Sequence, residues 1–332
     1  MKELQAIIGH LCGTASPSVL VTLTSVQGSS YRRPGARMLV TDAGGRIGSI
    51  SGGCLEEDVV EHARQVAANN RPEVITYDTS AENDLVWGVG LGCHGVVKIL
   101  LEPVQARPSW AQAVSKNLLA GEETQLEAIW DSNTGRLGTR LVEDPNGENA
   151  SAKPGVFVDR IAPPPTLTVF GAGDDAQPLA RIAQELGWRV TVADVRPAMA
   201  TATRFPGCFA LVLGPAEDLV GRSFPPPGSL AVVMTHHYRH DVPLLRSLLP
   251  LPLAFLGLLG PKRRSEKILA DLAEGGLAIT ASMRSRFHAP VGLDLGADAP
   301  EEVALSIIAE MQATLSGRDA RPLKDRQQPI HA

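Results

Sequence analysis

The sequence predicts an α/β protein of two domains, a mixed α+β domain followed by a doubly wound parallel sheet. Three observations lead to this fold class. Up to the run APPP at residues 162–165, short β-branched segments alternate with hairpin turns. Beyond it, apolar strands alternate with amphipathic helices. A glycine-rich turn joins the first strand of that second part to its first helix. We expect domains at residues 1–160 and 166–316, and a polar tail at 317–332.

The composition is that of a folded protein that does not bind long polyanions. The chain has 332 residues, of which 44% are hydrophobic and 20% charged, which suits two packed domains. A formal net charge of -5 argues against nucleic acid or an anionic membrane surface as a partner. No apolar run approaches the roughly 20 residues that cross a bilayer. The start MKELQAIIGHLCG has the spacing of an amphipathic helix, so we expect a cytoplasmic protein.

The first domain continues from that helix with strands, one further helix packed between them, and a hairpin extension. We expect strands at 19–26, 37–41, 46–51, 73–79 and 96–103, helices at 55–70 and 110–122, and a hairpin formed by 125–132 and 137–143. The segment DAGG fits a tight turn between the second and third strands.

The second domain alternates strands and helices throughout. We expect strands at 166–173, 188–197, 209–214, 230–237 and 254–260, and helices at 175–187, 242–250, 262–276 and 301–317. The strands are almost continuously apolar, as in a sheet covered on both faces, and the intervening helices make the connections parallel.

The turn VFGAGDDAQPLA places Gly171-x-Gly173-x-x-Ala176 between a strand and a helix. Gly171 permits the tight turn, Gly173 lets the backbone approach a pyrophosphate, and Ala176 allows close packing of helix on sheet. Asp194 ends the second strand, where a carboxylate can accept a hydrogen bond from a ribose 2′-hydroxyl. The pattern predicts a Rossmann-like domain with a cofactor-binding crevice.

The same turn does not decide which ligand this domain binds. Asp174 and Asp175 face the position of a pyrophosphate and compete with a bound anion for the positive helix end. Arg196, two residues after the acid that ends the second strand, favours an extra phosphate. The sequence is therefore compatible with NAD(P) in this domain and with a different ligand. The three histidines of THHYRHD lie in a strand-to-helix loop, where substrate contacts are favoured over a metal site.

The segment GSISGGCLEE raises the question of why a thiol follows two glycines at a strand-to-helix junction. Gly52 and Gly53 let backbone amides turn toward a ligand. If the helix begins at Cys54 or Leu55, its free N–H groups and positive dipole end favour the thiolate. The alternative is a small buried residue that only fills space.

The charged residues around this cysteine act in opposite directions. The acids at 56–58 stabilise the helix start but disfavour a nearby thiolate. Arg32, Arg33 and Arg37 precede the turn and restore positive potential if they lie close. A second glycine-lined loop, GVGLGCHGVV, carries Cys93. Two such cysteines suit a soft metal or sulfur chemistry better than a hydrolase triad.

Many blocks of the chain, in order, resemble one family. They are QGSSYRRPGARMLV, GSISGGCLEE, GLGCHGVVKILLEP, VFGAGDDAQPLA, THHYRHD, LGLLGPKRRSEKI and APVGLDLGADAPEEVALSIIAEM. The chain is similar to the XdhC/CoxI family of xanthine dehydrogenase accessory proteins, with an N-terminal XdhC/CoxI domain and a C-terminal Rossmann domain. The resemblance covers nearly the whole chain and is weakest at about 104–160.

The resemblance implies a chaperone for the molybdenum cofactor, molybdopterin, without turnover of its own. Such a protein binds the cofactor, supports its sulfuration by a cysteine desulfurase and delivers it to a xanthine or carbon monoxide dehydrogenase-type molybdoenzyme. It implies that Cys54 contacts the molybdenum or its sulfido ligand, that Gly52 and Gly53 cradle the cofactor, and that Arg33 meets its phosphate. Cys93 is a second cysteine candidate. We also expect a homodimer.

Two alternatives remain. The first is an NAD(P)-dependent oxidoreductase that uses Gly171, Gly173 and Asp194, although the chain has no evident Tyr-x-x-x-Lys pair and this alternative leaves the Gly-Gly-Cys segment unexplained. The second is a homo-oligomeric scaffold whose Rossmann domain only docks on a dehydrogenase.

Overall fold

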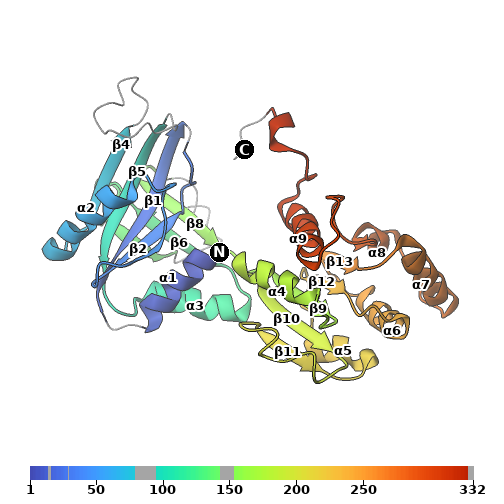
Figure 1. Cartoon of the computed structure of the whole chain (residues 1–332). Helices are drawn as coiled ribbons and strands as arrows, with labels where there is room; N and C mark the ends of the chain where they lie inside the picture. The colour runs from blue at the N-terminus through green and yellow to red at the C-terminus, as the bar shows by residue number, and fades with distance from the viewer. Residues whose placement is uncertain (14–15, 29, 79–94, 143–152, 328–332) are drawn as a thin grey trace. The chain divides into compact units, whose positions relative to one another are not determined.

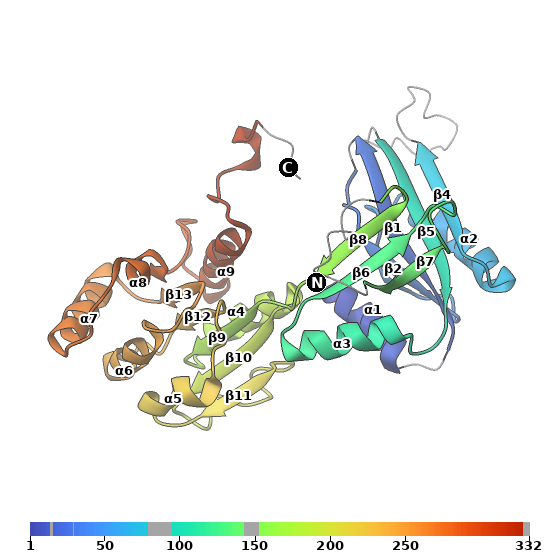
Figure 2. The ribbon, with the colours of Figure 1, turned by 180° about the vertical axis from the view of Figure 1, so that it is seen from behind.

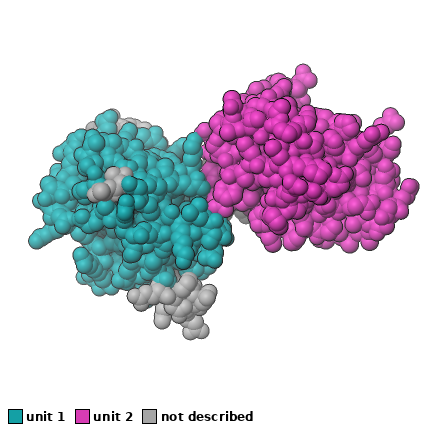
Figure 3. All heavy atoms as spheres, turned by 90° about the horizontal axis from the view of Figure 1, so that it is seen from below, with its two compact units in different colours: residues 1–163 teal, residues 164–332 magenta. Residues whose placement is uncertain are grey.

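The computed structural model divides the chain into two compact units, which Figure 3 shows in teal and magenta. Unit 1 comprises Met1–Pro163 and unit 2 comprises Pro164–Ala332, so the division falls inside the APPP run. The structure describes residues 1–13, 16–28, 30–78, 95–142 and 153–327. None of the helices in these ranges is long and apolar enough to span a membrane.

The described residues of unit 1 form two antiparallel sheets and three helices (Figures 1 and 2). In chain order the elements are α1 (Lys2–Gly13), β1 (Ser18–Gly28), β2 (Arg37–Thr41), β3 (Arg46–Gly48), α2 (Glu56–Asn69), β4 (Glu73–Asp78), β5 (Gly95–Val104), α3 (Ser109–Ala120), β6 (Thr124–Ile129), β7 (Gly138–Leu141) and β8 (Val156–Ile161). The larger sheet has the order β3-β2-β1-β5-β4 and the smaller sheet β7-β6-β8. The predicted hairpin of β6 and β7 is present, but the sequence analysis did not anticipate β8.

The alternation of side chains along β1 separates two cores in unit 1. Val19 and Val21 pack with Val59 and other apolar residues of α2 on one face of the larger sheet. Leu20 points to the opposite face, where it packs with residues of α1 and α3, among them Ile7. Because successive strand residues face opposite sides, one strand that is buried on both faces can serve both cores.

Unit 2 is a six-stranded parallel sheet covered by helices on both faces (Figure 1). Its elements are β9 (Thr166–Phe170), α4 (Ala176–Glu185), β10 (Arg189–Asp194), β11 (Ala210–Leu213), α5 (Ala216–Ser223), β12 (Leu230–Val233), α6 (Tyr238–Leu248), β13 (Phe255–Leu258), α7 (Lys262–Glu274), α8 (Ala281–Ser285), β14 (Phe287–His288), α9 (Pro300–Ser316) and a final 3-10 turn (Leu323–Asp325). The strand order is β11-β10-β9-β12-β13-β14. This is the predicted doubly wound sheet, with α5, α8 and β14 in addition.

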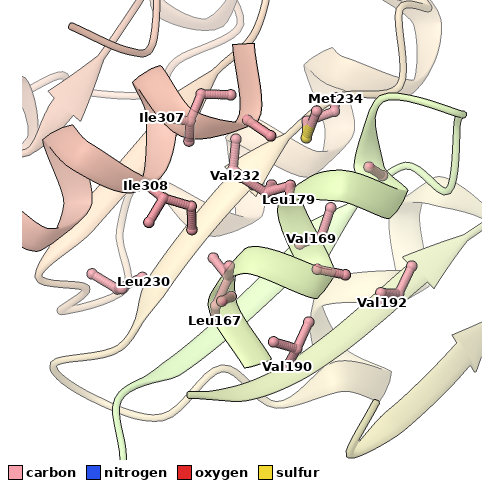
Figure 4. Close-up of a cluster of buried hydrophobic side chains, with 14 of the residues drawn as sticks. Leu167, Val169, Leu179, Val190, Val192, Leu230, Val232, Met234, Ile307 and Ile308 are labelled. Carbon is pink, nitrogen blue, oxygen red and sulfur yellow. The ribbon is translucent and has the colours of Figure 1, made fainter. Parts of the chain in front are cut away.

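The order in which the chain adds strands to this sheet reverses between β9 and β12, which are parallel neighbours. The strands β10 and β11 lie on one side of this point, and β13 and β14 lie on the other. On one face α4 and α9 pack against the strands, and Figure 4 shows Leu179 of α4 and Ile307 of α9 among the buried side chains. On the other face α5, α6 and α7 contribute a second core. In such sheets the crevice at the carboxyl ends of the strands, beside the reversal point, is the usual ligand position.

Two carboxylate contacts hold the sheets of unit 1 together. Arg37 at the start of β2 is buried and pairs with Asp159 of β8. Glu102 of β5 accepts hydrogen bonds from the Thr139 amide at 2.8 Å and from the Thr139 hydroxyl of β7. Burial raises the pKa of Glu102. The hydrogen bonds from Thr139 and the nearby charge of Arg37 lower it by less, so the pKa stays above its ordinary value.

We predict that Glu102→Gln changes the pH dependence of stability. Because the folded pKa of Glu102 is raised, the parent protein loses stability as pH rises from the unfolded value of about 4.3 through the folded one. The neutral glutamine lacks this loss, so the variant should equal or exceed the parent in unfolding free energy at pH 8. Urea unfolding at several pH values measures this. Glu127→Gln, at a partly exposed position of β6, is the control. A variant clearly less stable than the parent at pH 8 would contradict the prediction.

Candidate functional site

The Gly-Gly-Cys turn connects β3 to α2 in unit 1. After β3 the chain bends through residues 49–55 and enters α2 at Glu56, with Leu55 as the N-cap residue. The helix therefore begins later than the predicted start at Cys54 or Leu55, and Cys54 precedes its first turn. The physical reason is that Leu55 has no side-chain group to cap the helix, so the bonds that organise this end come from Ser51 and Glu56.

The carboxylate of Glu56, which is only 3% exposed, folds back over the turn. It accepts hydrogen bonds from the Ser51 amide at 2.9 Å, from the Ile50 amide at 3.3 Å and from the Ser51 hydroxyl. Burial alone would raise the pKa of Glu56, but these hydrogen bonds outweigh burial and hold the pKa below its ordinary value. The ionised carboxylate ties residues 50 and 51 to the first turn of α2.

The Ser51 hydroxyl is the second centre of the turn. It accepts from the Gly53 amide at 3.2 Å and from the Leu55 amide at 3.3 Å, and the Cys54 thiol lies 3.6 Å from it. The Gly53 amide is thus already used inside the turn. The Gly52 amide has no acceptor among the residues that the structure describes. Cys54 itself is exposed, so the alternative of a buried, space-filling cysteine does not apply to it.

The backbone of the turn requires a glycine at one of its two glycine positions. Gly53 has φ of +110°, a conformation that residues with a side chain rarely adopt. Among the described residues, no atom lies within 4 Å of the position that a Cβ of Gly53 would occupy. No described side chain therefore covers this side of the turn next to the exposed Cys54.

The three arginines that precede the turn have different roles. Arg32 pairs with Glu3 of α1, and Arg37 is buried with Asp159, so neither guanidinium is available to a ligand. Arg33 is exposed, and its guanidinium has no hydrogen bond or ion pair within the described part of the chain. Of the three arginines, Arg33 is therefore the one whose guanidinium can bind an anionic ligand, as the prediction for Arg33 requires.

Cys93, the second cysteine candidate, lies outside the described residues. The residues on either side are placed: β4 ends at Asp78 beside Val96 of β5, and the Tyr77 hydroxyl donates to Asp58 in the first turn of α2 at 2.5 Å. The end of β4 and the start of β5 thus lie at the same end of the sheet as the start of α2.

Two cavities of unit 1 lie near the other end of α2. One of about 270 Å³ is lined by residues including Ala63 and Ala67, and one of about 410 Å³ by residues including Glu102 and Arg136; both include Asn70. Neither is lined by the Gly-Gly-Cys turn. The predicted cofactor contacts therefore lie on an open surface and not in these hollows.

In unit 2 the predicted ribose acceptor is occupied by protein groups. Asp194 is 3% exposed and ends β10. Its Oδ1 accepts from the Arg196 amide at 2.7 Å and Nε at 2.9 Å, and its Oδ2 accepts from the Ala172 amide at 2.6 Å and Arg196 Nη2 at 2.9 Å. A carboxylate has about four acceptor positions, so none remains for a ribose hydroxyl. Burial would raise the pKa of Asp194, but these hydrogen bonds hold it below its ordinary value.

The two aspartates of the glycine turn also have internal partners. Asp174 pairs with Arg204 at 2.8 Å, and Asp175 lies 2.6 Å from Nε2 of His236. An Asp175 oxygen lies 2.6 Å from the position of a Cβ on Gly173, so only glycine fits there without a shift. The N-terminus of α4, where a dinucleotide would place its pyrophosphate, is therefore covered by a carboxylate and an imidazole.

A cavity of about 100 Å³ remains at the carboxyl ends of β9, β10 and β12. Its polar lining residues are Asp194, Arg196, Thr235, His237 and His240, and Gly171 also lines it. The rings of His237 and His240 stack with centroids 4.5 Å apart. The volume is well below the roughly 300–1,000 Å³ of typical ligand pockets. Within the described residues no group of three potential ligands could hold a metal ion.

Sequence reasoning missed the residues that fix the Gly-Gly-Cys turn. Ser51 lies five positions before Glu56, a spacing that matches no familiar capping motif, so no signal announced their contact. Tyr31, in the loop before β2, lies with ring atoms 3.6–3.9 Å from the Cβ position of Gly52. The proximity of a loop residue to a turn about 20 positions later depends on the pairing of β2 and β3, which only the structure reveals.

We predict that Asp194→Asn weakens unit 2 in a pH-dependent way. Because the folded pKa of Asp194 is lowered, its stabilisation is present above the unfolded value of about 3.9 and is lost as pH falls through the folded pKa. The variant should lose about 1–3 kcal/mol of unfolding free energy at pH 7 and a smaller amount near pH 3. Urea unfolding at both pH values measures this. Asp218→Asn, at an exposed pair with Arg222, should change stability by less than about 0.5 kcal/mol. An equal loss at both pH values would contradict the account.

Comparison with known proteins assigns both parts of the chain. Residues 13–78 match the model described as XdhC and CoxI family, and residues 167–311 match the XdhC Rossmann domain. The chain is 33% identical to a Bacillus subtilis (strain 168) protein named as a probable xanthine dehydrogenase subunit, over 95% of this chain and 98% of the relative. It is 25% identical to the Escherichia coli (strain K12) molybdenum cofactor insertion chaperone PaoD, over 89% of this chain and 82% of the relative.

A solved structure agrees with these matches. A crystal structure from Bacillus halodurans, described as a xanthine dehydrogenase, superimposes with a TM-score of 0.83 at 30% identity. The match covers 98% of this chain and 99% of that one. An antiparallel first unit with a Gly-Gly-Cys turn, a Rossmann-like second unit and relatives aligned over nearly their whole length lead to one assignment: the chain belongs to the XdhC/CoxI family.

Proposed function

We propose that this protein is an accessory protein that binds the molybdenum cofactor on unit 1 and delivers it to a xanthine or carbon monoxide dehydrogenase-type molybdoenzyme. One observation carries the proposal: an exposed cysteine lies on a turn that hydrogen bonds to the buried Glu56 carboxylate hold in place. The names of the Bacillus subtilis relative and of the Escherichia coli chaperone support an accessory role in the same chemistry.

The residues of the turn fit the chemistry of this cargo. A thiolate is a soft ligand that suits molybdenum or its sulfido group, and Cys54 is exposed. Arg33 supplies a guanidinium that no described residue neutralises, which suits the phosphate of the pterin. Gly52 retains an amide without a described acceptor, and Gly53 leaves open space. Cys93 remains a proposed second contact.

The open surface suits delivery better than storage. A ligand enclosed in a deep cavity leaves slowly, whereas cargo on a surface turn can pass to a partner protein that covers the same surface. We further propose that a cysteine desulfurase sulfurates the cofactor on this protein, that the protein acts in the cytoplasm, and that it forms a homodimer. On this account the protein has no catalytic residue of its own, and Cys54 is the metal-contacting residue.

We predict that Cys54→Ala abolishes retention of the cofactor. The parent protein, incubated anaerobically with the molybdenum-containing cofactor and then desalted, should retain close to one pterin per chain, measured by fluorescence after oxidation. The variant should retain at least about tenfold less, since a coordinating sulfur is lost and the turn is otherwise unchanged.

The matched control is Cys208→Ala. Cys208 in unit 2 is partly buried, accepts a hydrogen bond from Gln184, and burial raises the pKa of its thiol to about 11. It should bind as the parent does. Equal retention by Cys54→Ala and the parent would remove Cys54 from the site, and no retention by the parent would refute the proposed function.

NAD(P) bound to unit 2 is the second candidate, supported by the Rossmann fold with Gly171 and Gly173. It ranks second because Arg196 and Ala172 fill the acceptor positions of Asp194 and because Asp175 with His236 covers the pyrophosphate position. A dinucleotide would have to displace both sets of contacts.

We therefore predict that the parent protein shows no saturable binding of NADH or NADPH up to about 1 mM, near the weak end of ordinary affinities. A titration that follows nicotinamide fluorescence measures this. Saturable binding with a dissociation constant in the micromolar range would contradict this prediction. It would favour the NAD(P)-dependent oxidoreductase over the accessory protein.

A further inference from the structure

Tyr31 lies beside the Gly-Gly-Cys turn. The ideal Cβ position of Gly52 is 3.6 Å from Cγ, 3.7 Å from Cδ1 and 3.9 Å from Cδ2 of the Tyr31 ring. A point almost equidistant from these three atoms lies over the face of the ring and not beside its edge. One face of the Tyr31 ring therefore lies over Gly52, at a distance that leaves room for a Cβ between them.

The rest of the Tyr31 ring is open. The residue is 66% exposed, and among the described residues of unit 1 it is the one aromatic side chain in the exposed class. The chain has three tyrosines. The hydroxyls of Tyr77 and Tyr238 both donate to aspartates, whereas the Tyr31 hydroxyl has no partner among the described residues. No hydrogen bond within the described part of the chain explains why a flat aromatic face is exposed here.

The neighbours of Tyr31 match a ligand with three different parts. Arg33 follows two residues later with an exposed guanidinium, and the exposed thiol of Cys54 follows Gly52 by two residues. A flat heterocycle suits the ring, an anionic group suits the guanidinium, and a soft metal or sulfur suits the thiol. The molybdenum cofactor has a pterin ring, a phosphate and a molybdenum bound by dithiolene sulfurs.

We propose that Tyr31 stacks on the pterin ring of the cofactor, with its other face toward Gly52. This inference rests on the proposed function. It assigns the recognition of the heterocycle to Tyr31, so that Cys54 and Arg33 meet the two remaining parts of the ligand.

The test compares Tyr31→Leu with Tyr31→Phe and the parent protein. Leucine keeps an apolar side chain over Gly52 but lacks a ring, whereas phenylalanine keeps the ring. Anaerobic titration with purified molybdopterin should show Tyr31→Phe within about twofold of the parent, and Tyr31→Leu weaker by about 5- to 150-fold, the range for aromatic stacking on a heterocyclic base. The bound pterin should show an induced circular dichroism band in the parent and Tyr31→Phe, reduced at saturation in Tyr31→Leu.

Phe224→Leu is the matched control, since Phe224 is an 80% exposed aromatic residue of unit 2. It should bind as the parent does. Melting temperatures confirm that each variant is folded, and the retained ring of Tyr31→Phe separates stacking from a general effect on the loop. Tyr31→Leu binding within twofold of a parent that binds tightly would overturn this inference alone. Equal losses in the leucine and phenylalanine variants would also overturn it. No binding by the parent would overturn both this inference and the proposed function.

Discussion

The site of unit 1 depends on one buried carboxylate, which folds back and accepts hydrogen bonds from the turn that precedes its own helix. Glu56 opens α2 and accepts from the amides of Ile50 and Ser51, while the Ser51 hydroxyl gathers the amides of Gly53 and Leu55. Four amides of the turn are thereby bonded within it, and the Gly52 amide is not. Cys54 is left outside these bonds, apart from its contact with Ser51, and is exposed at a fixed point of the surface.

In unit 2 a buried carboxylate also fixes a turn, but there it occupies the positions that a ligand would use. Asp194 reaches from the end of β10 to the Ala172 amide of the glycine turn and is paired twice with the Arg196 side chain. Here the carboxylate that fixes the turn is also the group that a dinucleotide would need. A Rossmann-like fold is thus retained while its usual ligand contacts are used for internal structure, which is why fold and ligand have to be argued separately.

The fold followed from the sequence because its signals are local and periodic. The strands of unit 2 are apolar runs between helices, and the turn from Gly171 to Ala176 marks the first crossover. The start of α2 was placed too early because Leu55 carries no capping group and the organising acid follows it at Glu56. Tyr31 was not singled out because its contact with Gly52 depends on strand pairing, a long-range property that no local pattern encodes.

Hydrogen exchange measured peptide by peptide, with and without molybdopterin, tests the location of the cargo most directly. The account predicts slower exchange at residues 31–36 and 49–55, which surround the Gly-Gly-Cys turn of unit 1, with little change in the crevice of unit 2. Protection confined to residues 171–176 and 235–241 would contradict it and would move the site to the Rossmann-like unit.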